Sequence, residues 1–359
     1  MRISVISFTA RGAELSRQIS RLVGSGMELS LYTKYKGPAD RKADKEEEKQ
    51  EIQPVSESLS LWTGEQFEGK NALLFIGACG IAVRAIAPFL KDKLTDPPVL
   101  VMDEAGKFVI PILSGHYGGA NELAKQLAEK TGATAVITTA TDVNGLFAVD
   151  VFAKKNNLVI CNRDGIEKVS SRILEEKSIT MAVAGGRTGA APKEVILLPY
   201  PVQKRVSVLI SPFQEEADIA DLQLCPRAIV IGIGCRRGKT LPQIEAVLRK
   251  QVEKAGIRWE AISAIASIDR KGEEKGLLEL AGKYQFPFLT FSKEELSGVA
   301  GEFQASAFVQ EQVGVDNVCE RSAVAALGGQ GRLISEKYVE DGITIAVAAQ
   351  DWRVVFDEE

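Results

Sequence analysis

Short apolar runs alternate with segments of helical spacing along most of the chain. The runs at 3–8, 72–76 and 99–102 have the length of buried strands. Between them, apolar residues recur every three or four positions over 11–23 and 81–90, as they do along one face of a helix. A repeated alternation of strand and helix predicts an α/β fold, with central, mostly parallel sheets flanked by helices.

The pattern divides the chain into three α/β-type units. Residues 1–140 and 227–359 each alternate strand and helix, whereas 141–226 has shorter strands and is expected to form a smaller middle domain. A length of 359 residues fits two or three domains of about 150 residues each. We therefore expect an N-terminal α/β domain, a middle domain and a C-terminal α/β domain.

One segment of the first unit has almost no apolar residues. Residues 36–53 are mostly Lys, Glu, Asp and Arg. Because nothing in this segment can anchor a hydrophobic core, we expect a solvated surface loop.

Composition excludes several classes of protein. With 45% hydrophobic and 26% charged residues, the chain is expected to be globular rather than disordered or fibrous. A net charge of -4 with few aromatic residues argues against a nucleic-acid partner, and no apolar run approaches the roughly 20 residues of a membrane span. One histidine and no Cys-x-x-Cys pair argue against a zinc site. The first residues form a strand pattern rather than a leader peptide, so we expect a cytoplasmic protein.

Three segments place glycines between an apolar strand and the start of a helix. Glycines let backbone amides approach a ligand, and a helix start offers free N–H groups and a partial positive charge. Such turns favour phosphate or carboxylate groups. The three lie at 77–84, 114–121 and 232–240.

The third turn invites a nucleotide-binding interpretation, which its spacing does not satisfy. A P-loop has four residues between its first glycine and the Gly-Lys-Thr, whereas Gly232 leaves five and Gly234 leaves three. The dinucleotide fingerprint also fails, because its third glycine comes one place late, at Gly238. Nucleotide binding, a general anion site and a merely structural turn stay open, and we favour the anion site.

The single histidine, His116, lies in the turn at 114–121, at the carboxyl end of a predicted strand, where open α/β sheets bind ligands. There an imidazole can act as a general base, and the alternative is a histidine that hydrogen-bonds its own loop. Ser114 lacks the Gly-x-Ser-x-Gly surroundings of a nucleophile elbow, which argues against covalent catalysis. Glu104 could orient His116 or activate water, although turn carboxylates are usually solvated. Asp142 could cap the segment that follows it.

Other polar residues have simple structural interpretations. Cys79 and Cys235 lie at predicted helix starts, where a thiolate is stabilised, but a small residue filling a strand–helix corner is the simpler interpretation. Glu320 and Arg321 are adjacent in the last predicted helix, where a surface ion pair is the default expectation.

Four segments in combination resemble a known family. The most specific is the Ser-Gly-His-x-Gly-Gly-Ala-Asn turn within 101–142, and the others are FIGACGIAVRAIAPFL at 75–90, GIGCRRGKT at 232–240 and VCERSAVAALGG at 318–329. These segments resemble the cobalt-precorrin-5A hydrolases of cobalamin biosynthesis, over roughly residues 59–349.

The resemblance implies an enzyme of the anaerobic vitamin B12 pathway. Such enzymes open the ring-A acetate δ-lactone of cobalt-precorrin-5A and release the former bridge carbon with its methyl group as acetaldehyde, giving cobalt-precorrin-5B. The substrate is a small-molecule cobalt tetrapyrrole that carries its own cobalt, so we expect no cofactor and no protein metal site. Two other functions stay open: a noncatalytic tetrapyrrole-binding carrier, and a phosphate- or nucleotide-using transferase. Neighbouring pathway enzymes and a homodimer are open as partners.

Under this interpretation, His116 and Glu104 are the predicted catalytic residues, with His116 activating water or the departing oxygen. Backbone amides of Gly118 and Gly119 are expected to stabilise the oxyanion at the lactone carbonyl. Predicted substrate-binding residues offer amides, cationic groups or other polar groups to a polycarboxylate: Cys79, Gly80, Arg84, Ser114, Gly118, Gly119, Asn121, Asp142, Gly234, Cys235, Arg236, Arg237, Lys239, Glu320, Arg321 and Ser322.

Overall fold

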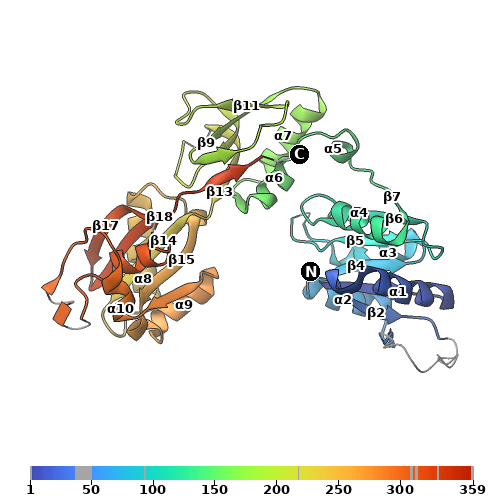
Figure 1. Cartoon of the computed structure of the whole chain (residues 1–359), viewed down its shortest axis with the longest axis horizontal. Helices are drawn as coiled ribbons and strands as arrows, with labels where there is room; N and C mark the ends of the chain where they lie inside the picture. Colours follow the sequence, from blue (N-terminus) through green and yellow to red (C-terminus); the bar gives the residue numbers. More distant parts are fainter. Residues whose placement is uncertain are drawn as a thin grey trace. The chain divides into compact units, whose positions relative to one another are not determined.

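The computed structural model describes residues 2–36, 51–92, 94–216, 218–307, 310–311, 314–329 and 331–356. Most of the charged segment predicted as a surface loop at 36–53 therefore lies outside the described residues. The chain forms two compact units, Met1–Val151 and Phe152–Glu359 (Figure 1).

The first unit is built on a seven-stranded sheet with the order β3-β2-β1-β4-β5-β6-β7. All neighbouring strands are parallel except β5 and β6, which are antiparallel. The strands are β1 (Arg2–Ser7), β2 (Glu28–Thr33), β3 (Gln53–Pro54), β4 (Ala72–Ile76), β5 (Val99–Met102), β6 (Phe108–Leu113) and β7 (Thr134–Ala135).

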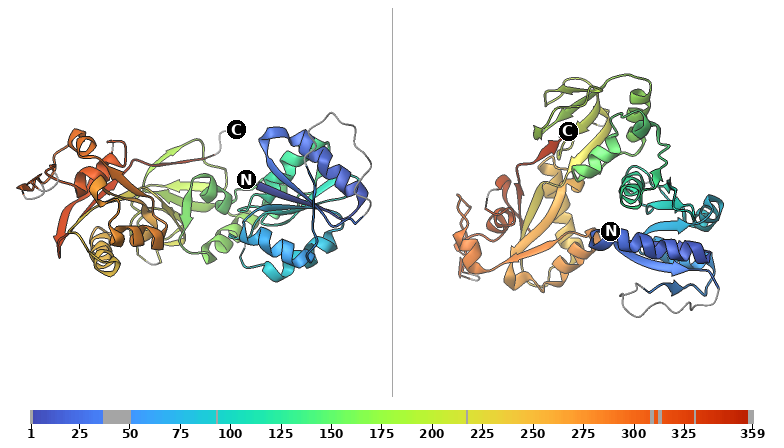
Figure 2. Two further views of the ribbon diagram at one scale, coloured as in Figure 1. Left: turned by 90° about the horizontal axis from the view of Figure 1, so that it is seen from below. Right: turned by 45° about the vertical axis from the view of Figure 1, so that its right-hand side comes forward.

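Helices cover both faces of this sheet, which explains why every residue of β4 is buried (Figure 2). Successive side chains of a strand point to opposite faces. Leu74 therefore packs in the core that contains Ile19 of α1 and Leu127 of α4, and Phe75 packs in the core that contains Trp62 of α2 and the buried residues of α3. The helices are α1 (Ala10–Val23), α2 (Leu59–Glu68), α3 (Cys79–Ile86), α4 (Ala120–Thr131), α5 (Ala140–Val143) and the start of α6 (Val149–Lys155).

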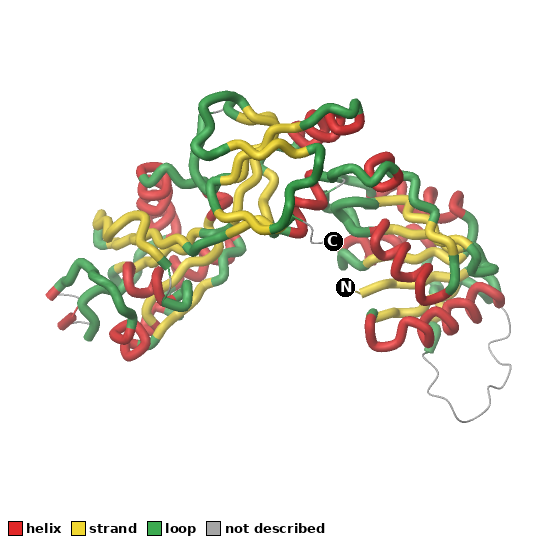
Figure 3. Tube along the Cα trace, turned by 45° about the horizontal axis from the view of Figure 1, so that its top comes forward, coloured by secondary structure: helices red, strands yellow, loops and turns green. Residues whose placement is uncertain are grey.

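The second unit contains two five-stranded sheets, which Figure 3 shows in yellow. In the first sheet, of order β11-β9-β12-β13-β8, only β8 is antiparallel to its neighbour. Helix α7 (Asp164–Leu174) contacts β13 and β9. The strands are β8 (Leu158–Ile160), β9 (Ile179–Val183), β11 (Val195–Leu198), β12 (Val206–Ile210) and β13 (Ala220–Pro226).

The second sheet has the order β16-β15-β14-β18-β17, with β14, β15 and β16 parallel and β17 and β18 antiparallel to their neighbours. Helices α8 and α9 share one core with this sheet, and α12 packs on its other face. The elements are β14 (Ile229–Cys235), α8 (Leu241–Lys254), β15 (Ile262–Ile268), α9 (Lys275–Tyr284), β16 (Phe288–Phe291), α10 (Lys293–Gly298), α12 (Cys319–Ala325), β17 (Arg332–Glu340) and β18 (Ile343–Ala349).

A short parallel ladder joins the end of the chain to the middle of the sequence. Strand β19 (Arg353–Val355) follows β18 and pairs with β10 (Gly186–Thr188). This pairing brings the last segment beside the first sheet of the same unit.

The predicted α/β class, with mostly parallel sheets flanked by helices, is confirmed. The division into 1–140, 141–226 and 227–359 stays a prediction, since the structure separates two compact units at Val151 and the second holds two sheets. None of the helices in the described ranges has both the length and the apolar content needed to span a lipid bilayer.

Candidate functional site

The turn between β6 and α4 holds His116 in a tightly folded loop. The amide of Ala120 donates to the carbonyl of Ser114 over 3.1 Å, and the amide of Asn121 donates to the carbonyl of Gly115 over 3.0 Å. At Gly118 a Cβ would lie 2.2 Å from the Cβ of Ser114, so a side chain at this position would force the turn open.

The imidazole of His116 is held by polar side chains of the α5 segment. Its Nε2 lies 2.5 Å from Oδ2 of Asp142 and 2.8 Å from Oγ1 of Thr141. The same Asp142 oxygen accepts a 2.8 Å hydrogen bond from Nδ2 of Asn121, which also donates to Thr139 over 3.0 Å. Asn121 and Thr141 are buried, whereas the His116 side chain keeps 18% of its surface exposed. The imidazole is therefore fixed in place and still accessible.

These contacts define what the imidazole can do. A carboxylate accepts but does not donate, so Nε2 carries the proton that Asp142 accepts, and in a neutral imidazole the free lone pair is then on Nδ1. On the other side of the ring, Oδ2 of Asp150 of α6 lies 3.9 Å from Nδ1. That separation is too long for a direct hydrogen bond and suits a bridging water. The arrangement is that of a general base oriented by a carboxylate.

The predicted partnership of Glu104 with His116 does not occur in this structure. Glu104 accepts a 2.7 Å hydrogen bond from Oγ1 of Thr9, and Asp142 occupies the orienting position instead. The prediction that the amides of both Gly118 and Gly119 stabilise an oxyanion also changes. The amide of Gly119 is already engaged, because it donates to the carbonyl of His116 over 3.0 Å. Within the described part of the chain, the amide of Gly118 has no such partner.

Thr141 and Asp150 are neighbours of His116 that were not predicted from the sequence. The signal for Thr141 was the polar run at 138–142, which follows an apolar strand and ends in Asp142. Ser114, also a predicted site residue, uses its hydroxyl to donate to the carbonyl of Asp96 over 2.8 Å.

The first glycine turn leaves its predicted residues exposed. Cys79 and Gly80 begin α3, and Nη1 of Arg84 lies one turn later, donating to the carbonyl of Gly80 over 3.4 Å. The guanidinium group therefore remains at the surface of the first unit.

The third glycine turn lines a cavity of about 520 Å³ in the second unit. Its described lining includes four cationic side chains and no carboxylate: Arg236, Arg237, Lys271 and Lys337. Lys271 forms a 2.8 Å ion pair with Glu274, and the other three have no ion-pair partner among the residues that the structure describes. The cavity is thus suited to an anionic ligand.

The predicted residue Lys239 and its neighbour Gly238 have partners within the protein. Lys239 forms a 2.8 Å ion pair with Asp341, and the amide of Gly238 donates to Glu274 over 2.7 Å. Although burial opposes it, hydrogen bonds from Lys271 and Gly238 hold the pKa of Glu274 below its usual range. The turn therefore already binds one carboxylate, that of Glu274.

Gly234 and Cys235 also line this cavity, and the thiol is partly buried. Burial raises the pKa of Cys235, so the environment favours the neutral thiol over a thiolate. This agrees with a residue that fills a strand–helix corner.

The expectation of a surface ion pair between Glu320 and Arg321 is wrong. Glu320 is fully buried, and its carboxylate accepts hydrogen bonds from the amides of Gln304 and Lys337 and from the side chain of Asn317, over 2.5 to 2.8 Å. Because these donors come from separate segments, Glu320 ties them to the start of α12.

The other two predicted residues of α12 also make internal contacts. Arg321 pairs with Asp316 at 2.7 Å and lies over the ring of Phe303. Ser322 is buried and donates to the carbonyl of Cys319 over 3.2 Å. None of these contacts presents a side chain to a ligand. In the described ranges, no three His, Cys, Asp or Glu side chains are placed to hold a metal ion, and the expected absence of a metal stays a prediction.

Three family models match consecutive parts of the chain. They are cobalamin synthesis G N-terminal over residues 62–142, cobalamin biosynthesis central region over 147–226 and cobalamin synthesis G C-terminus over 229–348.

Curated relatives agree with these models. A cobalt-precorrin-5A hydrolase of Salmonella typhimurium is 36% identical, covering 78% of this chain and 82% of its own length. Another, of Priestia megaterium, is 30% identical and covers 96% and 94% of the two chains. A crystal structure of a putative cobalamin biosynthesis protein G homolog from Sulfolobus solfataricus is 22% identical, covering 97% of this chain and 96% of its own, with a TM-score of 0.38.

The resemblance carried by the four sequence segments together is therefore confirmed. Matches to all three models, and to long relatives of at least 30% identity, leave no large part of the chain unassigned. The chain belongs to the cobalamin synthesis G family, the family of the cobalt-precorrin-5A hydrolases.

Proposed function

We propose that the chain is a hydrolase of cobalamin biosynthesis that acts on cobalt-precorrin-5A, as the names of its curated relatives indicate. It opens the ring-A acetate δ-lactone, which frees a hydroxyl group on the former bridge carbon. This hydroxyl group loses its proton, the bond from its carbon to the macrocycle breaks with the electron pair left on the macrocycle, and the two-carbon unit leaves as acetaldehyde, giving cobalt-precorrin-5B. The observation that carries this proposal is the His116–Asp142 pair, since ester hydrolysis needs a positioned base near water.

Lactone opening then follows from the geometry of this pair. Nδ1 of His116 takes a proton from water while the water oxygen attacks the lactone carbonyl carbon. The amide of Gly118 donates to the oxyanion that develops. As the ring C–O bond breaks, the imidazolium returns its proton to the departing oxygen, and Asp142 stabilises the charged ring throughout.

The cavity at the third glycine turn supports binding of a polycarboxylate. Arg236 and Arg237 offer planar guanidinium groups that match carboxylates bidentately, and Lys337 adds a point charge. Peripheral carboxylates of a tetrapyrrole are the kind of group that this cavity suits. Cobalt enters as part of the substrate, and no cofactor is proposed.

Acetaldehyde release tests the proposal. The purified protein is incubated with cobalt-precorrin-5A without oxygen, with a trap for acetaldehyde, beside the variants His116→Ala and Glu104→Gln. We expect release by the natural chain and by Glu104→Gln, and loss of release in His116→Ala. No acetaldehyde from the natural chain would refute the hydrolase function, and undiminished release by His116→Ala would refute the assigned base alone.

The alternatives give different results in the same assay. A carrier would bind the corrinoid without turnover, and a transferase would bind nucleotide through Lys239. That lysine is engaged with Asp341, so no contact among the described residues favours the transferase. Cytoplasmic location, a homodimer and neighbouring pathway enzymes as partners remain predictions.

A further inference from the structure

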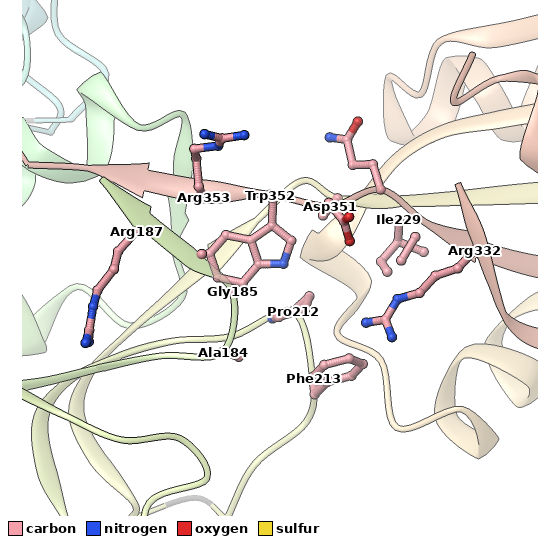
Figure 4. Close-up of a pocket in the computed structure, with 14 residues that line it drawn as sticks. Ala184, Gly185, Arg187, Pro212, Phe213, Ile229, Arg332, Asp351, Trp352 and Arg353 are labelled. Carbon is pink, nitrogen blue, oxygen red and sulfur yellow. The ribbon is translucent and has the colours of Figure 1, made fainter. Parts of the chain in front are cut away.

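The second unit contains another cavity, of about 470 Å³, that none of the predicted site residues lines. It lies beside the β10–β19 ladder, where the strand pair meets the start of β14 (Figure 4). Its lining comes from segments far apart in the sequence, chiefly 184–187 and 349–353. No local sequence motif indicates this cavity.

An indole ring forms part of the cavity wall. A Cβ at Gly185 would lie 2.6 Å from Cε2 of Trp352, so the ring packs directly against the glycine backbone. The amide of Gly186 donates to the carbonyl of Trp352 over 2.9 Å, which fixes the main chain at the same point. The indole stays partly exposed to the cavity. A fixed, partly exposed ring offers a stacking face to a flat ligand.

Cationic groups surround this ring. Arg187, Arg332 and Arg353 line the cavity with one carboxylate, Asp351. In Figure 4, Arg187 and Arg332 lie on opposite sides of Trp352. None of the three guanidinium groups has an ion-pair partner within the described ranges. Arginines without partners beside an aromatic face are suited to a planar ligand with several anionic groups.

A nucleotide and a macrocycle bearing carboxylates are both planar and anionic, and the positions of the arginines distinguish between them. Phosphates of a nucleotide sit together and are usually held by amides at a helix start. Gly185 leads instead into strand β10, which begins at Gly186, and the arginines come from three separate strand segments. Carboxylates distributed around a macrocycle match this arrangement better.

We propose that this cavity is a second binding site of the protein, one that takes the edge of a flat conjugated tetrapyrrole bearing carboxylates. Trp352 stacks on the ring edge, and Arg187 and Arg332 bind carboxylates on either side. The choice of a tetrapyrrole rests on the proposed function, whereas the affinity for a flat polyanion rests on the cavity alone. A volume of this size holds part of a macrocycle rather than all of it.

Fluorine NMR of the full chain labelled with 5-fluorotryptophan tests the site. The chain has three tryptophans, so Trp352→Phe assigns the Trp352 resonance, and Trp62 and Trp259, which pack in hydrophobic cores, report folding. The probe is uroporphyrin, a planar octacarboxylate, and ATP is titrated in parallel. The double variant Arg187→Ala/Arg332→Ala is compared with Arg17→Ala, which removes a surface arginine of α1.

We expect uroporphyrin to shift the Trp352 resonance saturably in the natural chain and in Arg17→Ala. In the double variant, binding should weaken by about tenfold or more while the other two resonances stay in place. No saturable shift in the natural chain, an equal response in the double variant, or a response to ATP alone would overturn the proposal. Turnover is not needed, so an inactive chain with an intact Trp352 response would refute the hydrolase and not this site.

Discussion

At the scale of single residues, the ability of His116 to act as a base depends on its partner Asp142. Asp142→Asn keeps the shape of the side chain but removes the charge that stabilises imidazolium and fixes the proton on Nε2. We expect kcat for acetaldehyde release to fall by roughly a hundredfold or more, with a smaller change in KM. Glu104→Gln is the matched comparison, because Glu104 bonds to Thr9. A larger loss in Glu104→Gln than in Asp142→Asn would reverse the assignment.

The residue scale also shows what sequence could predict about the site. The glycine turn and its histidine were predictable, because strand, glycines and helix start are adjacent in the chain. The partner of His116 was not, since Asp142 follows 26 residues later and Glu104 lies much nearer to His116 in the sequence. Only the packing of α5 against the turn separates the two carboxylates.

At the scale of elements, Gly232 allows α12 to pack on β14. A Cβ there would lie 1.8 Å from the carbonyl oxygen of Cys319, so alanine must push the helix away from the sheet. We expect Gly232→Ala to lower the free energy of unfolding of the second unit by about 1–3 kcal/mol, measured by urea denaturation. Gly282→Ala is the control, because nothing lies within 4 Å of its Cβ position. Equal stability of the two variants would contradict this packing role.

The same element explains a sequence pattern that was hard to interpret. The glycines at 232 and 234 nearly match nucleotide motifs, yet they lie in strand β14, and Gly232 meets the backbone of α12. Helix packing therefore gives Gly232 a function that spacing alone could not distinguish from ligand binding. The antiparallel direction of β17 and β18 could not be predicted either, because the order and direction of strands depend on contacts between distant segments.

A second prediction at this scale concerns acid stability between α8 and α9. Hydrogen bonds from Lys283, Tyr284 and Arg249 lower the pKa of Glu245 to about 2. A carboxyl group whose pKa is lower in the folded state stabilises the fold at pH values above its unfolded pKa near 4.5. This contribution is lost as the pH falls towards 2.

Glu245→Gln removes that contribution. We expect the variant to be less stable than the natural chain by up to about 1 kcal/mol near neutral pH, because the pair is close to solvent. The difference should shrink between about pH 5 and pH 2. Urea denaturation across this range measures it, with Glu279→Gln as a control for a solvated ion pair. A difference that grows on acidification would contradict the assigned pKa direction.

At the scale of the whole molecule, each of three described hydrophobic cores lies within one unit. The cores around β4 contain residues of the first unit only, and the core around α8 contains residues of the second only. The sequence pattern predicted three parts because it reflects only the local alternation of strands and helices. The β10–β19 ladder, which joins the middle of the sequence to its end within the second unit, has no local signal.

Separate cores predict two unfolding transitions in differential scanning calorimetry. Gly118→Ala places a Cβ 2.2 Å from Ser114 in the first unit, and Gly232→Ala disturbs α12 in the second. Each variant should lower the midpoint of one transition by several degrees and leave the other in place, because a change in one core does not alter the packing of the other. A single transition that both variants shift would show that the two cores unfold together, and the division at Val151 would then not be a thermodynamic one.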